Sequence, residues 1–280
     1  MLNFLYLKRL PRWAFLSLVA NGLFLLLLVS PWQHYSPLPK LNPISSSLPS
    51  IPLKQFGAEA SETQNNPGEQ QYLSYQQWVD LLQREAQVAA TNQPENLAIL
   101  LGDSISLWFP QTLLPHHNHW LNQGISGETS AGLVKRLHLL DRTQPEVIYI
   151  MIGINDVIRG FKDDTIVANQ ELIVRYLKKR HPRTKLVIQS ILPHSGEKAT
   201  WEGRDRLLEI SNDKIQNLNL RLKAIADRER IIYLDLYSLF ADQEGKLRTD
   251  LSTDGLHLNR EGYQLWGIAI QVCSQLALSR

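Results

Sequence analysis

Short apolar segments alternate with amphipathic segments from Leu97 to the C-terminus, and this alternation constrains the fold more than any other feature. Apolar runs of strand length occupy Leu97–Leu101, Val147–Ile152, Lys185–Ile191 and Ile231–Leu234, and a weaker one ends at Trp120–Asn122. Helical spacing marks Ser130–Leu140, Thr165–Arg180, Asp205–Arg228 and Arg260–Leu278. Strands alternating with helices favour right-handed crossovers and a parallel sheet covered on both faces. The pattern predicts an α/β domain of three layers with a five-stranded parallel sheet.

An uncharged run, WAFLSLVANGLFLLLLV, occupies residues 13–29 near the N-terminus. As a helix it would be about 26 Å long, at the short end for crossing a bilayer. Lys8, Arg9 and Arg12 precede it, and no basic residue follows until Lys40. This asymmetry predicts an uncleaved membrane anchor that places the rest of the chain outside the cytoplasm, in the periplasm or at the cell surface. The alternatives are a cleaved signal peptide and a buried core helix.

The segment after this run is rich in proline and serine, and residues 31–67 hold seven of the fourteen prolines. Such a composition favours a semi-extended tether. The apolar spacing of Ser74–Ala90 then predicts a leading helix. The sequence therefore predicts an anchor over 1–30, a linker over 31–70, a leading helix within 71–96 and a folded domain over 97–280.

Composition excludes several classes of protein. Cys273 is the only cysteine, so neither an intrachain disulfide nor a cysteine-rich zinc site is available. Residues 1–58 carry five positive charges and no negative one, which leaves 24 basic and 27 acidic residues in the remainder. A folded part with that balance has no electrostatic reason to bind nucleic acid.

A serine follows the first apolar strand directly, in the tract Leu101-Gly102-Asp103-Ser104. The carboxyl end of a buried parallel strand is where reactive residues gather in such sheets. A serine there can act as a nucleophile when a base lies beside it, and otherwise it is a helix N-cap.

Asp254 and His257 can supply that base, because residues three apart can share one turn. The carboxylate would hold the proton on one imidazole nitrogen and leave the other free to take the serine proton. Gly127 and Asn155 follow the second and third strands, where a glycine N–H and an amide side chain can stabilise an oxyanion. Taken singly, each of these residues is equally consistent with an ordinary turn.

These residues fall in four ordered blocks: Gly102-Asp103-Ser104, Asn122-x-Gly124-x-Ser126-Gly127, Gly153-x-Asn155-Asp156 and Asp254-x-x-His257. Together the blocks resemble the SGNH-type hydrolases of the GDSL esterase/lipase superfamily. The resemblance implies a flavodoxin-like fold and ester hydrolysis with no metal or other cofactor. It implies Ser104 as nucleophile, His257 as base and Asp254 as its orienting partner. It also implies an oxyanion hole formed by the N–H groups of Ser104 and Gly127 and the side chain of Asn155.

The substrate class stays open between two resemblances. The tract from Gly153 to Phe161 is similar to bacterial thioesterase/lysophospholipases, whereas the segment from Ile191 to Glu197 is similar to the platelet-activating-factor acetylhydrolase-like branch. We expect a lipase or acylhydrolase acting on carboxylic or thio esters of a small molecule, lipid or acylated saccharide. Rival hypotheses are a carbohydrate O-acetylesterase for envelope or extracellular polysaccharide, a non-catalytic anchored binding domain, and a flavin-binding domain.

Several other residues have an open role. His116, His117 and His119 are more typical of a solvated loop than of a metal site, because no carboxylate or cysteine accompanies them. Trp108, Phe109 and Trp201 are candidates for a substrate cleft or for core packing. Residues 194–204 form a polar, mobile-looking loop that could shape an acyl pocket, and Arg159 is either a surface residue or a contact for an anionic group.

Overall fold

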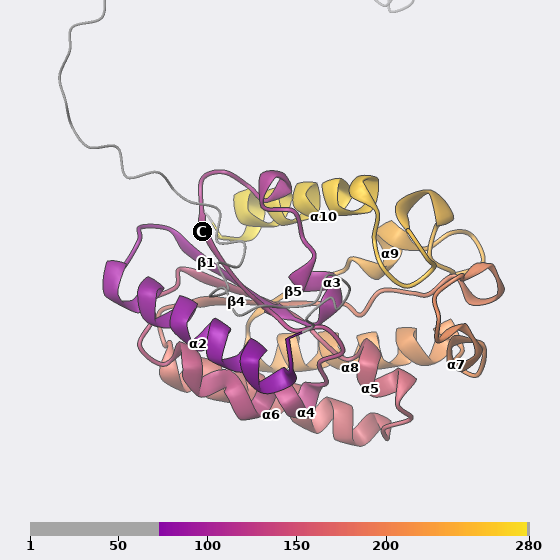
Figure 1. Cartoon of the computed structure of the whole chain (residues 1–280), viewed down its shortest axis with the longest axis horizontal. Helices are drawn as coiled ribbons and strands as arrows, with labels where there is room; N and C mark the ends of the chain where they lie inside the picture. The colour runs from indigo at the N-terminus through magenta and orange to yellow at the C-terminus, as the bar shows by residue number, and fades with distance from the viewer. Residues whose placement is uncertain (1–72, 279–280) are drawn as a thin grey trace, which may run out of the picture. The chain divides into compact units, whose positions relative to one another are not determined.

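The computed structural model describes residues 73–278, and its centre is a parallel sheet of five strands in the order β2-β1-β3-β4-β5 (Figure 1). The strands are β1 (Leu97–Gly102), β2 (His119–Gly124), β3 (Val147–Met151), β4 (Lys185–Gln189) and β5 (Ile232–Leu234). The predicted α/β fold with a five-stranded parallel sheet is confirmed, and its strand order is that of flavodoxin-like folds.

Burial explains why the central strands are continuous apolar runs. Every residue of β1 and β3 is buried, because both strands lie inside the sheet and are covered on both faces. The register places Gly102, the last residue of β1, opposite Gly124 of β2 and Met151 of β3. The segments that follow these three strands therefore leave the same edge of the sheet side by side.

Helices cover both faces of the sheet (Figure 1). One layer contains α4 (Ser130–Arg136), α6 (Asp163–Arg180) and α8 (Asn212–Glu229), and α10 (Arg260–Cys273) covers the opposite face. Trp266 of α10 is fully buried, and its indole N–H donates to Gln189 Oε1 of β4 at 2.7 Å. The shorter helices are α3 (Ser104–Leu107), α5 (Ile154–Ile158), α7 (Arg204–Leu208) and α9 (Tyr237–Phe240).

The leading helix α2 (Tyr75–Asn92) packs beside β2 and begins at a capping box, in which the Ser74 hydroxyl accepts from the N–H of Gln77. Its buried residues are Leu82 and Ala86. The side chain of Gln123 in β2 donates to the Leu82 carbonyl at 3.2 Å, which joins the helix to the edge of the sheet.

Two helices differ from their predicted extents. The helix expected over Asp205–Arg228 is divided into α7 and α8, because the Ser211 hydroxyl caps a new start and accepts from the N–H of Lys214. The His194 ring also donates to the Ile210 carbonyl at 2.9 Å, and a continuous helix would use that carbonyl internally. The final helix, expected to reach Leu278, ends at Cys273 and is followed by a π-helical turn over Ser274–Leu278.

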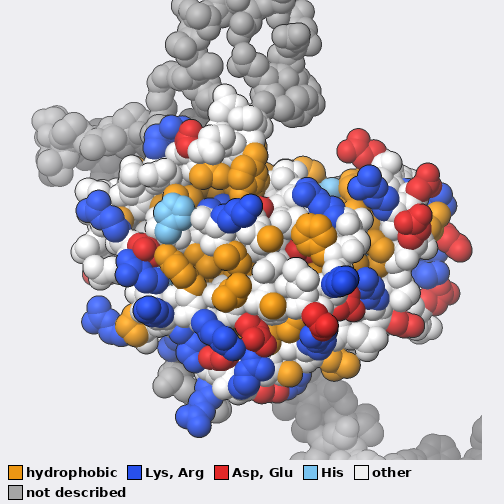
Figure 2. All heavy atoms as spheres, turned by 90° about the horizontal axis from the view of Figure 1, so that it is seen from below, with side chains coloured by type: hydrophobic (Ala, Val, Ile, Leu, Met, Phe, Trp, Pro, Cys, Tyr) orange, Lys and Arg blue, Asp and Glu red, His pale blue; other side chains and the backbone are white. Residues whose placement is uncertain are grey.

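The predicted membrane anchor at 13–29 and the proline-rich linker at 31–70 lie outside the described residues. Within residues 73–278, no helix combines the length and hydropathy needed to cross a bilayer. Figure 2 shows the outer surface of the layer that contains α4, α6 and α8, where apolar side chains lie among many Lys and Arg side chains.

Candidate active site

Ser104 lies at the first position of α3, where the chain leaves the carboxyl end of β1. The fully apolar strand buries the backbone up to Gly102, and the Asp103 carboxylate then accepts from the Ile105 N–H at 3.0 Å and caps the short helix. Ser104 is buried at 6% exposure, and its side-chain oxygen lies 3.1 Å from Nε2 of His257. The strand and the cap together fix the position of the serine hydroxyl.

Glycine is required where β2 passes beside α3. A Cβ atom on Gly124 would lie 2.5 Å from the Leu107 nitrogen, which is closer than any ordinary contact. The Asn122 side chain reinforces this approach, because it donates to the Ser106 carbonyl at 2.7 Å and accepts from the Gly124 N–H at 3.0 Å. The second sequence block therefore holds the helix that carries Ser104.

Asp254 and His257 share a tight turn just before α10. Nδ1 of His257 lies 2.7 Å from Oδ2 of Asp254, and Oδ1 of Asp254 accepts the backbone N–H groups of His257 (2.8 Å) and Leu256 (3.0 Å). Because an ionised carboxylate only accepts, Nδ1 carries the hydrogen and Nε2 presents a lone pair to the Ser104 hydroxyl. The structure thus brings Ser104, His257 and Asp254 into one hydrogen-bonded line.

The same hydrogen bonds keep Asp254 ionised. Burial by itself would raise the pKa of this carboxyl group, but the bonds from the His257 side chain and from the two backbone N–H groups outweigh it and lower the pKa. The carboxylate therefore stays charged at neutral pH and can stabilise a protonated imidazole.

The polar loop 194–204 supports this turn, and this support was not predicted from the sequence. The Asp254 carbonyl accepts from the N–H groups of Thr200 (2.8 Å) and Trp201 (2.9 Å). Gly255 has φ +88°, and a Cβ atom there would lie 2.6 Å from Ala199. Residues 194–196 and Ala199 of the loop are buried, whereas residues 197, 198, 200 and 202 are exposed. The loop therefore supports the turn of Asp254 and His257, and its role in shaping an acyl pocket stays a prediction.

The two remaining predicted residues leave the same edge of the sheet. Gly153 (φ +135°) follows β3 and starts α5, which places Asn155 in the first turn. The Asn155 Nδ2 atom is buried and has no hydrogen-bond partner among residues 73–278. Gly127 adopts φ +71°, and its carbonyl accepts from Nη2 of Arg159 at 2.7 Å. Arg159 therefore joins the two segments that carry Gly127 and Asn155.

A buried ion pair, which the sequence analysis missed, lies behind the site. The Arg136 guanidinium meets the Glu128 carboxylate at 2.8 Å, both side chains are 3% exposed, and a second guanidinium nitrogen donates to the Gly102 carbonyl at 3.3 Å. The Tyr75 hydroxyl of α2 donates to Glu128 at 3.2 Å. Glu128 lies before α4 and Arg136 is its last residue, so no helical spacing between the two indicated the pair.

Asp103 is the most perturbed carboxyl group near Ser104. Burial raises its pKa to about 7, the nearby Asp156 and Glu128 charges act in the same direction, and the bond from the Ile105 N–H opposes them. Asp156 accepts from the Ser130 N–H at 2.8 Å, which joins α5 to the start of α4. Burial raises the pKa of Asp156 as well, against the bonds from Ser130.

The three aromatic candidates for a substrate cleft have different environments in the structure. Trp108 is 49% exposed, and its ring centroid lies 4.4 Å from that of His257. Phe109 is buried against Trp266 at 4.7 Å, and the partly buried Trp201 packs against the core. Within residues 73–278, no cluster of three or more His, Cys, Asp or Glu side chains is placed to hold a metal.

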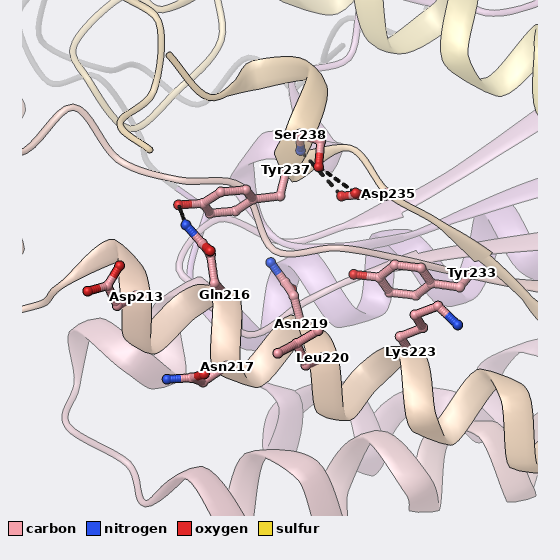
Figure 3. Close-up of a pocket in the computed structure, with 10 residues that line it drawn as sticks. All are labelled: Asp213, Gln216, Asn217, Asn219, Leu220, Lys223, Tyr233, Asp235, Tyr237 and Ser238. Atoms are coloured by element: carbon pink, nitrogen blue, oxygen red, sulfur yellow. Dashed lines mark hydrogen bonds between the residues drawn. The ribbon is translucent and has the colours of Figure 1, made fainter. Parts of the chain in front are cut away.

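A groove in the described part of the chain is separate from these residues. The groove, of about 510 Å³, runs between α8 and the end of β5, and it contains none of Ser104, Asp254 or His257 (Figure 3). Tyr237 and Tyr233 lie along it, with Asp235 hydrogen-bonded to Ser238 at its rim. Its mixed acidic, basic and amide lining indicates no single ligand class.

Comparison with known proteins identifies a matching family model, described as the GDSL-like lipase/acylhydrolase family, over residues 60–265. An arylesterase from Vibrio mimicus is 27% identical over 126 residues, which are 40% of this chain and 63% of that protein. A multidomain esterase from Ruminococcus flavefaciens is 26% identical over 211 residues, which are 71% of this chain and 25% of that protein. The chain thus spans less than two thirds of the length of either relative.

A solved structure gives the same fold. The GDSL-like lipase of Bacteroides thetaiotaomicron superimposes with a TM-score of 0.58 at 24% identity, covering 71% of this chain and 99% of that chain. The described strands and helices therefore have the arrangement found in that lipase.

Proposed function

Because the chain belongs to the GDSL-like lipase/acylhydrolase family, we propose that it hydrolyses carboxylic or thio esters through an acyl-enzyme formed on Ser104. The observation that carries this proposal is the continuous hydrogen-bonded line from Ser104 through His257 to Asp254. A hydroxyl alone is a weak nucleophile, and this line supplies the base and the group that orients it.

The first half-reaction forms the acyl-enzyme. Nε2 of His257 takes the Ser104 proton as Oγ forms a bond to the substrate carbonyl carbon, and the carbonyl oxygen becomes an oxyanion. The N–H groups of Ser104 and Gly127 and the amide of Asn155 donate to that oxyanion. The bond to the leaving oxygen or sulfur then breaks, and the leaving group takes the proton from Nε2.

The second half-reaction releases the acid. Water gives a proton to Nε2 and attacks the acyl carbon, and the resulting oxyanion uses the same three donors. Breaking of the bond to Oγ returns the proton to Ser104 and frees the carboxylic acid. The unpartnered, buried amide of Asn155 supports this role, because an orphaned donor is costly unless a ligand uses it.

The proposed substrate is an ester of the kind that lipases and acylhydrolases cleave, and an acylated saccharide is the second candidate.

The uncharged run at 13–29 supports a membrane-tethered enzyme outside the cytoplasm. Protease treatment of intact cells would degrade the tethered domain if it is exposed at the cell surface, or after the outer layer is opened if it is periplasmic. Protection until the inner membrane is broken would contradict this location.

Ser104→Ala tests the nucleophile, with Ser106→Ala as a matched control in the same helix. The Ser106 hydroxyl is buried, without a partner among residues 73–278, so its loss leaves the proposed chemistry unchanged. We expect Ser104→Ala to lower hydrolysis of p-nitrophenyl acetate by about 10⁴-fold or more and to abolish labelling by a fluorophosphonate probe. Activity of Ser104→Ala near that of the Ser106→Ala protein would refute the assignment.

A further inference from the structure

Trp108 shares one helical turn with the proposed nucleophile. Its backbone N–H closes the turn that begins at Ser104, with a bond of 3.0 Å to the Ser104 carbonyl. Trp108 is the C-cap residue of this short helix. The ring planes of Trp108 and His257 are inclined by 43°, with centroids 4.4 Å apart. The nucleophile and an aromatic ring thus contact the same imidazole.

The indole is not a core residue. Half of Trp108 is exposed, whereas the next residue, Phe109, is 5% exposed and packs on Tyr263 and Trp266. A tryptophan left half in water at a proposed reaction centre keeps an apolar face available for a ligand, and aromatic faces of this kind recur in ligand sites.

The chemistry of the proposed function determines which part of a substrate meets this ring. Nε2 of His257 takes the proton from Ser104 and then gives it to the leaving oxygen, so the leaving group must lie beside Nε2. The Trp108 ring lies 4.4 Å from the His257 ring, so a leaving group that takes its proton from Nε2 would lie close to the indole.

We infer that Trp108 forms the platform of a leaving-group subsite and selects esters whose alcohol carries a ring that can pack on the indole, either a planar aryl ring or the apolar face of a pyranose. This inference rests on the proposed function, because it uses the direction of proton transfer from His257. Stacking of an aryl ring on an aromatic side chain contributes about 0.5–1.5 kcal/mol beyond area burial, which corresponds to a selectivity of roughly 2- to 12-fold. On this inference the indole meets the alcohol and does not select the acyl group.

Esters that differ only in the alcohol test the subsite. The panel contains 2-naphthyl acetate, an O-acetylated methyl pyranoside and 2,2,2-trifluoroethyl acetate, which is activated but has no ring. We expect Trp108→Leu to raise KM for one or both ring esters by roughly 3- to 10-fold more than it raises KM for trifluoroethyl acetate, because an effect of the variant on His257 would be common to all three esters. The ring ester whose KM rises shows whether the subsite takes an aryl or a saccharide alcohol. Trp108→Tyr keeps an aromatic face and should retain the preference.

A second series varies the acyl group and keeps the alcohol constant. Trp108→Leu should change the activity on 2-naphthyl acetate, 2-naphthyl butyrate and 2-naphthyl octanoate by the same factor. An altered acyl-length preference, or an equal loss on the ring and non-ring acetates, would overturn the inference.

Wild-type protein gives an independent test that needs no variant. Free 2-naphthol or the deacetylated pyranoside should compete with trifluoroethyl acetate, and trifluoroethanol at the same concentration should not. Equal inhibition by all three alcohols would also overturn the inference. If Ser104→Ala keeps its activity, the proposed function fails. If Ser104→Ala is inactive and the alcohol preference does not change, only the leaving-group subsite fails.

Discussion

Replacing Asp254 with Asn tests the role of the carboxylate with little change in shape. Oδ1 of the amide can still accept the N–H groups of His257 and Leu256, which lie at 2.8 and 3.0 Å. At the other position, an NH₂ group replaces the oxygen that lies 2.7 Å from Nδ1. Because NH₂ donates, Nδ1 must accept, and the hydrogen moves to Nε2. The imidazole then presents a hydrogen instead of a lone pair to Ser104.

The expected loss in kcat is on the order of 10⁴, the effect of the same substitution in serine proteases, or about 5.4 kcal/mol of transition-state stabilisation. The free energy of unfolding at neutral pH should fall by less than about 2 kcal/mol, because two of the three bonds persist. Initial rates on p-nitrophenyl acetate and urea unfolding measure the two effects.

The pH dependence of stability gives a second check on this variant. Since the folded-state pKa of Asp254 is lowered, its contribution to stability is present above the pKa of the unfolded carboxyl and is lost as pH falls through the folded value. The free energies of unfolding of wild type and Asp254→Asn, measured as a function of pH, should therefore converge as pH falls through the folded-state pKa of Asp254.

Asp250→Asn is the matched control. Asp250 lies four residues before Asp254, and its exposed carboxylate pairs with Arg248 at 2.7 Å, a surface interaction that contributes little to stability. Its kcat should stay within about 2-fold of wild type. A loss of less than tenfold in Asp254→Asn would refute the argument from the proton position.

Two further predictions concern buried polar groups. Asn155→Ala should lower kcat by roughly 10²–10³-fold. The melting temperature should stay nearly unchanged, because Nδ2 has no partner within residues 73–278 that would be left unpaired. A loss below about fivefold in initial rates would contradict the oxyanion role. Asp103 has a folded-state pKa raised to about 7, so the native state holds its proton longer than the unfolded chain, and wild-type stability should fall as pH rises from about 4 to about 7. Asp103→Asn should remove this part of the pH dependence of the free energy of unfolding, measured by urea unfolding at several pH values. If the free energies of the two proteins change with pH in parallel, the expectation is wrong.

The sequence predicted the central strands β1 and β3 better than the edge strand β2, for a physical reason. β1 and β3 are buried on both faces and are therefore continuous apolar runs. β2 is an edge strand whose first residues, His119 and Trp120, are exposed or half-buried, so only its end gave a signal. The break between α7 and α8 was missed although Ser211 is a local capping residue, and the bond from His194 to the Ile210 carbonyl could not be read from helical spacing.

Two of the four sequence blocks supply the hydrogen-bonded line of Ser104, His257 and Asp254, but the neighbours of these residues could not be assigned from the sequence. Trp108 and Phe109 are adjacent aromatic residues, and only the direction of the short helix places one on His257 and the other in the core. The support of Asp254 by the 194–204 loop joins segments more than fifty residues apart through backbone groups, which leave no trace in side-chain patterns. The bond from Arg159 to the Gly127 carbonyl was equally hidden.

The contacts of α2 connect the leading helix to the strand that ends at the proposed nucleophile. Tyr75 donates to Glu128, Glu128 pairs with Arg136, and Arg136 binds the carbonyl of Gly102, two residues before Ser104. Because Glu128 and Arg136 are both buried, loss of either one would leave a buried charge unpaired beside the end of β1. The buried pair thus makes the position of α2 and the position of the reaction centre depend on one another.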